Sequence, residues 1–558
     1  MSDTQKRNTF FGGAAILAVG SLIVKLIGAL YKIPLGNILS NEAFVDFNTA
    51  YNVYNFFLTI STAGLPVALS KTISEANALD RQRQVERIFA VAMKTFLVLG
   101  LASFVAMSFF GGPLASAMGD DSAVYCVRAL SPSVLCVCIM AALRGFYQGK
   151  SNMMPTAVSQ IIEAGCKLIF GLILAWLVMK LMTGEETFKQ RMAATGAIAG
   201  VSIGSVIALI YMLVWFARDR RTRRAGLGSD TPDSGSRIFG RLMQLAIPIT
   251  LGSAAVSIVT LIDTRVVLTL LERMYEDMPE LISPAALEQT AHAGGVTPEL
   301  FMAQGLKGIY DKCMAIYNLP SQLMVAITAS VIPAVSAALA QKNKLAASRT
   351  SESALRIGVM LCFPMGVGLF ALAGPIVELL FPGKMDLAIA GPVMGWLGLA
   401  SIVVCIMLLC NSILQAYGLV NLPVITVVVG GIIKIVVNYA LVGNYNINIK
   451  GAPIGTLACF AVASAMDLVF IKRHIPHPPK YLRAFLKPLI ASVVMGFAAW
   501  AVYGLLAGTL GNALACVAGI GVGVVVYAVL ILALKAISMD DLALMPKGDK
   551  IAKILHIK

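Results

Sequence analysis

Charged residues are scarce in this sequence: Asp, Glu, Lys and Arg make up 13% of its 558 residues. A soluble chain of this length would carry roughly a quarter. Hydrophobic residues reach 58% and gather in blocks of about twenty or more, the length that crosses a ~30 Å hydrocarbon layer. The shortage of charge excludes a soluble globular protein and predicts an all-α polytopic membrane protein.

Other absences narrow the function. No G-x-x-x-x-G-K-[ST] string and no large polar domain is present, so ATP hydrolysis is not expected. The ten cysteines form no C-x-x-C pair and stand mostly inside apolar blocks, where they predict small packing residues. Histidine is too rare for a metal site or a proton relay in the membrane, and we expect no metal and no cofactor. The four histidines, all outside the apolar blocks, are His292, His474, His477 and His556.

The apolar blocks and the positive charges predict fourteen spans with both termini on the cytoplasmic side. In this arrangement 29 of the 44 Lys and Arg residues lie in inside segments and 8 in outside segments. That asymmetry follows the positive-inside rule, so the net charge of +15 reflects orientation and requires no nucleic acid. The spans lie near residues 10–35, 45–70, 88–110, 123–147, 155–180, 193–217, 240–271, 305–335, 354–380, 388–414, 422–443, 451–472, 485–507 and 513–537.

An internal repeat organises these spans. Lys167 follows Gln148 by 19 residues, Lys434 follows Gln415 by the same 19, and both passages cross a proline turn. The same offset aligns the proline of "STAGLPVAL" with that of "TASVIPAVS". We therefore predict two parallel six-helix repeats plus two appended helices. The predicted parts are an N-terminal lobe (1–217), a polar cytoplasmic linker (218–239), a C-terminal lobe (240–472), and helices 13–14 with a cytoplasmic tail (473–558).

Several charges stand inside the predicted spans. Lys25 lies about two turns from either end of its span, so it should face a cavity rather than lipid. Lys94 lies closer to an inside loop and can reach it with its ammonium group. Glu163 and Lys167 are one helical turn apart and can form a structural pair, whereas Gly430 stands one turn before Lys434.

Asp263 and Arg265 stand in the seventh span, where they point about 200° apart on one helix and need different partners.

Two further spans carry polar stripes. The stripes predict either a substrate-binding face or ordinary hydrogen bonds between helices. The stripe residues are Asn48, Tyr51, Asn52, Tyr54 and Asn55 in the second span, and Tyr310, Asp311, Lys312, Tyr317 and Asn318 in the eighth.

The string "GAIAGVSIG" places Gly196, Gly200 and Gly204 at four-residue intervals. Small residues at that spacing lie on one helix face and let a neighbouring backbone approach closely. We interpret this ladder as helix packing.

Three passages resemble the polysaccharide-transporter branch of the MOP flippase superfamily, in particular its stage V sporulation protein B-like and YtgP-like members, which include lipid II flippases. They read "RGFYQGKSNMMPTAVSQIIE", "LIDT" and "ILQAYGLVNLPVITVVVGGIIK". The resemblance covers nearly the whole chain. It implies a MATE-like two-lobed transporter and not an enzyme.

The resemblance implies a function: outward translocation, by alternating access, of an undecaprenyl-pyrophosphate-linked sugar across the bacterial cytoplasmic membrane. Lipid II for peptidoglycan synthesis is the expected cargo, and cell-wall synthesis machinery is a candidate partner besides membrane lipids. A required arginine in helix 1 of relatives matches Lys25 in "IVKLIG", and an acid before A-F matches Glu42 in "NEAF". A further arginine of relatives has no match, since Asn52 and Asn55 occupy that region. Lysine lacks the bidentate fork that arginine offers phosphate.

Pyrophosphate requires cations in a dehydrated cleft, and sugars require amide and hydroxyl groups. These needs select the candidate substrate-binding residues. They are Lys25, Lys32, Glu42, Asn52, Asn55, Asp263, Arg265, Asp311, Lys312, Asn318 and Lys434.

Two other functions compete with this reading. A MATE-like multidrug cation exporter would prefer carboxylates and aromatic rings in its cleft, whereas the first span offers Lys25 and Lys32. An integral-membrane glycosyltransferase would need a catalytic acid near an outside loop, for which Glu42 or Asp46 could serve. The duplicated halves argue against that enzyme, because one active site does not need two equivalent lobes.

The charge asymmetry predicts the orientation of two loops. We expect cysteines introduced between Gly226 and Ser236 to react with a membrane-impermeant thiol reagent only from the cytoplasm. Cysteines introduced between Pro279 and Gly295 should react only from outside. Labelling of both loops from one side would contradict the fourteen-span arrangement.

Overall fold

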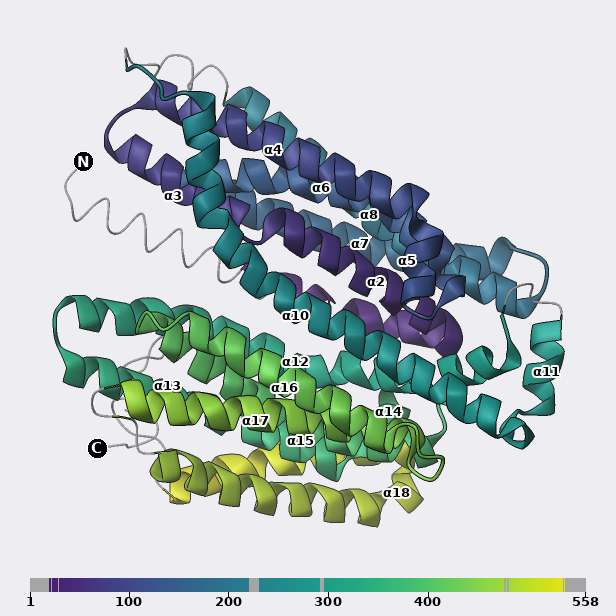
Figure 1. Cartoon of the computed structure of the whole chain (residues 1–558). Coiled ribbons are helices and arrows are strands. Elements are labelled where there is room, and N and C mark those ends of the chain that lie inside the picture. Colours follow the sequence, from purple (N-terminus) through teal and green to yellow (C-terminus); the bar gives the residue numbers. More distant parts are fainter. Residues whose placement is uncertain are drawn as a thin grey trace. The chain divides into compact units, whose positions relative to one another are not determined.

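The computed structural model describes residues 20–219 except 22 and 29, 230–291, 296–475, 478, 481–534 and 536. Every regular element in these ranges is a helix (Figure 1). Eleven of the described helices are long and apolar enough to cross a membrane. The all-α membrane class is thus confirmed.

The helices differ from the predicted spans at three places. The first predicted span begins in residues outside the described part of the chain, and the tail after residue 536 also lies outside it. The eighth falls in α12 (Pro298–Ala340), which is not among the eleven. The last two are merged in α18 (Tyr481–Ala533), which kinks at Gly511, where φ is +73°.

The chain forms two compact units. Unit 1 comprises Met1–Thr269 and Met278–Gly308, and unit 2 comprises Leu270–Asp277 and Ile309–Lys558. The helices α10 (Gly235–Asp277) and α12 both run from one unit into the other. The other helices of unit 1 are α2 (Asn41–Thr62), α3 (Leu65–Ala78), α4 (Gln82–Phe109), α5 (Gly111–Ala117), η1 (Asp121–Ala123), α6 (Val124–Gly149), α7 (Met154–Leu181), α8 (Glu186–Arg218), η2 (Pro279–Leu281) and α11 (Pro284–Ala291).

Local sequence sets where these helices begin and end. The Ser40 side chain caps α2 by accepting a hydrogen bond from the backbone N–H of Ala43. Between α6 and α7 the chain turns through Ser151, where φ is +59°, and Pro155 stands in the first turn of α7. The proline turn predicted between the spans near residues 123–147 and 155–180 is therefore present.

The glycine ladder of α8 lies against α7, as predicted. A Cβ added at Gly200 would lie 2.3 Å from the backbone nitrogen of Gly171 on α7, and one added at Gly204 would lie 3.0 Å from the carbonyl of Glu163. Figure 1 shows α6, α7 and α8 side by side within unit 1. Only residues without a side chain permit the α7–α8 approach at Gly200.

Within unit 1, α10 runs antiparallel to α2 and α3. Asn52 donates to the Thr264 hydroxyl at 3.1 Å, and the hydroxyls of Ser257 and Thr59 lie 3.2 Å apart. At Gly64 the backbone N–H donates to Thr250 at 3.2 Å. Each step forward along α2 and α3 matches a similar step backward along α10, so the three contacts form one continuous seam.

The second part of the predicted linker is anchored to unit 1, whereas residues 220–229 lie outside the described part. The Asp230 carboxylate accepts the backbone N–H groups of Arg83 and Gln84, which open α4. Desolvation alone would raise the pKa of the Asp230 carboxyl, but these two N–H groups, its own backbone N–H and the Arg81 charge together lower it. Asp230 thus acts as a charged cap for α4.

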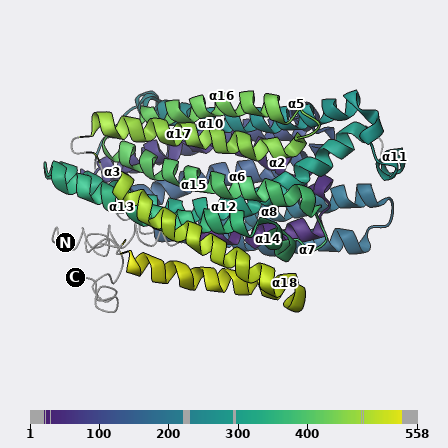
Figure 2. The same cartoon turned by 90° about the horizontal axis from the view of Figure 1, so that it is seen from below.

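Unit 2 contains α13 (Lys344–Ala371), α14 (Ala373–Leu380), α15 (Leu387–Ala416), α16 (Asn421–Leu441), η3 (Asn448–Lys450), α17 (Gly451–His474) and α18. The helix α15 packs against both α13 and α17, and α16 packs against α17. Figure 2 shows α16 beside α17. In unit 1, α6 packs against both α4 and α8, and α7 packs against α8.

The two units do not follow the predicted lobes at every point. By its contacts α10 belongs to unit 1 as far as Thr269, whereas the repeat assigns this helix to the C-terminal lobe. The reason is the seam, which joins α10 to α2 and α3. The lobe boundary within 218–239 stays a prediction.

The α7–α8 contact predicts opposite effects for two glycines. We expect Gly200→Ala to lower the free energy of unfolding by about 1–3 kcal/mol, the usual cost of overpacking. Gly165→Ala on α7 is the control, since its new Cβ would meet nothing within 4 Å and removes a flexible residue from a helix. Thermal unfolding of both detergent-purified variants measures the difference. Equal melting temperatures would contradict the packing.

Candidate substrate site

The Lys167 ammonium lies between aromatic rings inside unit 1. Its Nζ donates a hydrogen bond to the Tyr51 hydroxyl of α2. It lies 4.3 Å from the centroid of the Tyr51 ring and 5.2 Å from that of Tyr31. Aromatic faces stabilise a cation without neutralising its charge. Lys167 thus has aromatic and hydroxyl neighbours on α2 in addition to Glu163 on its own helix.

Glu163, one turn before Lys167, forms an ion pair with an arginine that the sequence did not predict. Its Oε2 lies 2.9 Å from Arg144 Nη2 on α6, and the two side chains are 24% and 12% exposed. Arg144 Nε also donates to the Ser159 hydroxyl at 2.9 Å. Glu163 acts electrostatically on Lys167 as well, and the structural pair of these two residues stays a prediction.

The polar stripe of α2 divides among several neighbours. Asn48 accepts a hydrogen bond from Lys32 Nζ at 3.0 Å, and Asn52 takes part in the seam with α10. Asn55 is exposed. Lys32, Lys167 and the two asparagines give unit 1 a set of cationic and amide groups close to one helix.

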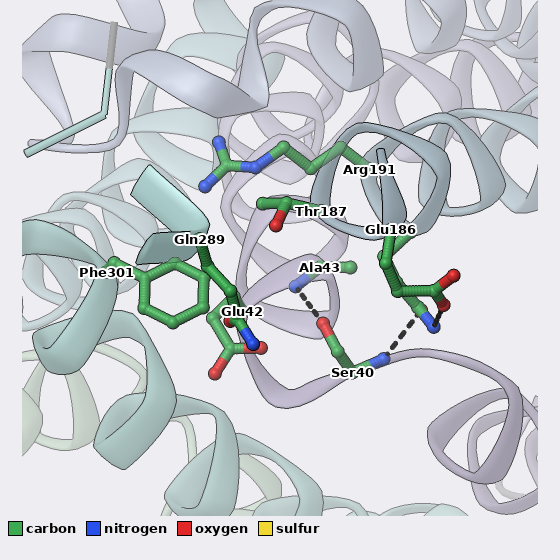
Figure 3. Close-up of a pocket in the computed structure, with 9 residues that line it drawn as sticks. Ser40, Glu42, Ala43, Glu186, Thr187, Arg191, Gln289 and Phe301 are labelled. Atoms are coloured by element: carbon green, nitrogen blue, oxygen red, sulfur yellow. Dashed lines mark hydrogen bonds between the residues drawn. The ribbon is translucent and has the colours of Figure 1, made fainter. Parts of the chain in front are cut away.

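Lys25 precedes this set in the sequence, and Glu42 lies between Lys32 and Asn48. Lys25 is half-buried in a helical stretch at 23–28. Glu42 stands in the first turn of α2 and lines a pocket of about 170 Å³ (Figure 3). Such a volume is below that of a drug-sized ligand site, so the pocket itself is too small for a lipid-linked sugar. Its lining residues are Ser40, Glu42, Ala43, Glu186, Thr187, Gln190, Arg191, Gln289 and Phe301.

Arg191 in this pocket was not among the predicted site residues. The charge count placed it in an outside loop, but α8 begins earlier, at Glu186, and carries Arg191 into the unit, where it is 9% exposed. Its guanidinium lies 3.9 Å from Asp46 Oδ2. Residue type and position alone give no signal for this, because the partner stands on a distant helix.

Arg265 also belongs to unit 1. Its Nη1 donates to the Ser116 carbonyl at 3.0 Å, at the end of α5. The guanidinium lies against Gly119, where φ is +74° and an added Cβ would come within 2.4 Å of Nη1. Asp263, two residues earlier, is half-buried.

The remaining candidates are in unit 2. Lys312 is completely buried, while Asp311 and Lys434 are half-buried. Asn318 donates to the Met314 carbonyl of its own helix at 2.7 Å. The role of these four residues as a group stays a prediction.

Known proteins identify the fold and the family. Residues 10–340 match the polysaccharide biosynthesis protein family, and residues 309–440 match the MatE family. The chain belongs to the polysaccharide biosynthesis protein family. This family is part of the MOP superfamily, and the relatives of the chain are transporters and flippases rather than enzymes.

Relatives of this family member cover most of its length. It is 25% identical to lipid II flippase MurJ of Bacillus subtilis (strain 168), over 89% of this chain and 88% of that protein. It is 22% identical to stage V sporulation protein B of the same organism, over 97% and 98%. The fold is similar to an inward closed conformation of lipid II flippase MurJ, with a TM-score of 0.66 over 93% of this chain and 98% of that one, at 16% identity. It is also similar to an inward-facing MATE family transporter, with a TM-score of 0.61 over 82% and 98%, at 15% identity.

The Glu163–Arg144 ion pair is expected to contribute more to stability than an exposed ion pair of the same protein. We expect Glu163→Gln to lower the free energy of unfolding by about 1.5–3 kcal/mol, because Arg144 would lose its charged partner in a largely buried position. The exposed pair of Glu75 and Arg241, 2.7 Å apart, provides the control: Glu75→Gln should cost less than about 1 kcal/mol. Melting temperatures of both purified variants test this, and an equal loss would show that burial does not decide the strength of the first pair.

Proposed function

We propose that this protein is a flippase that moves an undecaprenyl-pyrophosphate-linked sugar precursor across the bacterial cytoplasmic membrane by alternating access. Lipid II for peptidoglycan synthesis is the proposed cargo. The observation that carries the proposal is the cationic and amide interior of unit 1 in a member of this family. The resemblance over most of the chain to a protein named as a lipid II flippase supports the choice of cargo.

The cations of unit 1 suit a pyrophosphate. The Lys167 ammonium donates to the Tyr51 hydroxyl and lies near two aromatic rings, and the Lys32 ammonium donates to Asn48. Both ammonium groups can also donate hydrogen bonds to phosphate oxygens. Charge-assisted hydrogen bonds to phosphate are strong in a site that excludes water. We assign Lys25, Lys32 and Lys167 to the pyrophosphate, and Glu42, Asn52 and Asn55 to neighbouring polar groups of the cargo.

Unit 2 would contribute the second half of the site. We propose that Asp311, Lys312, Asn318 and Lys434 bind the cargo from that unit, together with Asp263 and Arg265 at the shared helix α10. If both lobes contact the cargo, binding of the cargo can shift the equilibrium between the inward-open and the outward-open state.

We also propose fourteen spans, in two parallel six-helix repeats plus two helices, with both termini in the cytoplasm. The number is reached by adding three spans to the eleven candidates. These are α12, the part of α18 beyond its kink, and the first predicted span. The repeat is supported by matching helix pairs: α4–α6, α6–α8 and α7–α8 in unit 1 correspond to α13–α15, α15–α17 and α16–α17 in unit 2. The short α5 after α4 also corresponds to the short α14 after α13.

A MATE-like multidrug cation exporter is the alternative, and the match of residues 309–440 to the MatE family favours it. The lysines of unit 1 argue for an anionic cargo instead, because like charges would repel a cationic drug. Binding of lipid II or of a lipophilic cation to the purified protein separates the two functions.

Lys25 provides the test of the cargo-binding role. We expect Lys25→Ala to abolish complementation in a strain depleted of its lipid II flippases, and Lys25→Arg to retain it, because a cation is needed at this position. Loss of one charged hydrogen bond should weaken lipid II binding by about 1.5–3 kcal/mol. Growth, accumulation of lipid II on the inner leaflet and membrane abundance are measured together.

Lys94→Ala is the matched control for this experiment. Lys94 is an exposed lysine of α4, so its removal should change neither growth nor abundance. Full activity of Lys25→Ala at normal abundance would remove the phosphate-binding role from this residue.

A further inference from the structure

A single hydroxyl, on the half-buried Ser122, lies between two carboxylates near the beginning of α2. Ser122 Oγ is 2.7 Å from Asp46 Oδ1 and 2.7 Å from Asp120 Oδ1, and both aspartates are completely buried. A serine hydroxyl has one hydrogen. It can donate to only one of the two carboxylates, so the other 2.7 Å contact requires a hydrogen from elsewhere.

Gln304 does not supply that hydrogen. Its Oε1 accepts from Arg191 Nη2 at 3.1 Å, and since arginine can only donate, the amide nitrogen must point the other way. There Gln304 Nε2 donates to Asp120 Oδ1 at 2.8 Å and to Ser122 Oγ at 2.9 Å. Both amide hydrogens are then in use, and Ser122 Oγ still has one lone pair free to accept.

The charges around the pair leave one negative charge uncompensated. The Arg191 guanidinium, 3.9 Å from Asp46 Oδ2, faces two carboxylates from α8. Thr195 on the same helix contacts the Cys126 thiol of α6, which also faces the pair. Lys307, one turn after Gln304 on α12, is buried but is not among the groups that act on Asp46. Burying a second carboxylate without a countercharge is costly.

The second oxygen of each carboxylate, Oδ2, provides an independent observation that points to a bound proton. Asp46 Oδ2 and Asp120 Oδ2 are both buried, and neither has a hydrogen-bond partner among the described residues. The described part of the chain also holds no cluster of three or more His, Cys, Asp or Glu side chains able to bind a metal ion. The site thus has room for a hydrogen, and its ligand set favours a proton over a metal cation.

We propose that Asp46 and Asp120 form a protonation site that binds one proton between them through Ser122. The proton adds to an oxygen of one carboxylate, and the new O–H donates to Ser122 Oγ. The serine hydrogen then goes to the other carboxylate, while Gln304 completes the fourfold arrangement around Oγ. No bond other than the O–H bond forms or breaks.

Water can reach this site through the pocket that Arg191 lines with Glu42. A cavity of about 170 Å³ with polar walls is large enough for several water molecules. Figure 3 shows Arg191 and Glu42 directed into this pocket from α8 and α2. Arg191 therefore both lines the pocket and lies 3.9 Å from Asp46 Oδ2, so it connects the pocket to the aspartate pair.

Proton occupancy also affects a helix that belongs to both units. Gln304 joins the first turns of α12 to Asp120 and Arg191, and α12 continues beyond Gly308 into unit 2. Loss of the proton places two like charges at Ser122 and weakens the attachment of α12. The coupling of this step to cargo movement rests on the proposed function, whereas the protonation itself does not.

Infrared spectroscopy of the full-length protein in lipid nanodiscs, without cargo, tests the site. At neutral pH the wild-type protein should show a protonated carboxyl band that shifts in D₂O. This band should be lost in Asp46→Asn and also in Asp120→Asn, so failure of one variant to fold leaves the other. Asp121→Asn, a neighbouring exposed acid, is the matched control and should retain it.

Ser122→Ala keeps both carboxyl groups and changes only the bridge. We expect its band to move to higher frequency, because the acid loses its hydrogen-bond acceptor. A wild-type spectrum without any band that depends on Asp46 or Asp120 overturns the proposal. So does a melting temperature that rises with Na⁺ at constant ionic strength in the wild type but not in Asp46→Asn, since the ligand would then be a metal cation.

Discussion

Every ionised side chain that this fold removes from water needs a partner inside the protein, because the hydrocarbon layer supplies none. The described interior of unit 1 meets this requirement with contacts between helices. Glu163 on α7 pairs with Arg144 on α6, and Lys167 binds the Tyr51 hydroxyl on α2. The polar groups thereby hold α2, α6 and α7 together at defined positions. The cationic interior proposed for the cargo depends on this framework.

The helix α2 separates two kinds of chemistry. Residues two apart on a helix point about 200° apart, so α2 directs Asn48 to Lys32 and Asp46 to Arg191. The first direction leads to Lys32, whose ammonium donates to Asn48. The second leads to a buried acid pair with one guanidinium. One helix thus borders both a region suited to an anionic cargo and a region suited to a proton.

The contacts of α10 are weaker than those around Glu163. Its contacts with α2 and α3 combine neutral hydrogen bonds, such as Asn52–Thr264 and Thr59–Ser257, each worth about 0.5–1.5 kcal/mol, with the exposed Glu75–Arg241 ion pair, worth less than about 1 kcal/mol. Water or the hydroxyl groups of a sugar can replace such bonds at little cost. The ion pair on α6 and α7 resists replacement, because a separated charge would remain buried.

The sequence alone was sufficient for the helical membrane class, the break before Pro155, the glycine ladder of α8 and the family. All of these depend on local composition, turn residues or spacing along one helix. The partners of the buried charges were decided only by the tertiary structure. Glu163 could be predicted to face inward but not to meet Arg144, and Arg191 was assigned to a loop although it lies beside Asp46. Helical periodicity determines which face a residue occupies, whereas the choice of the helix that covers this face depends on the packing of the whole unit.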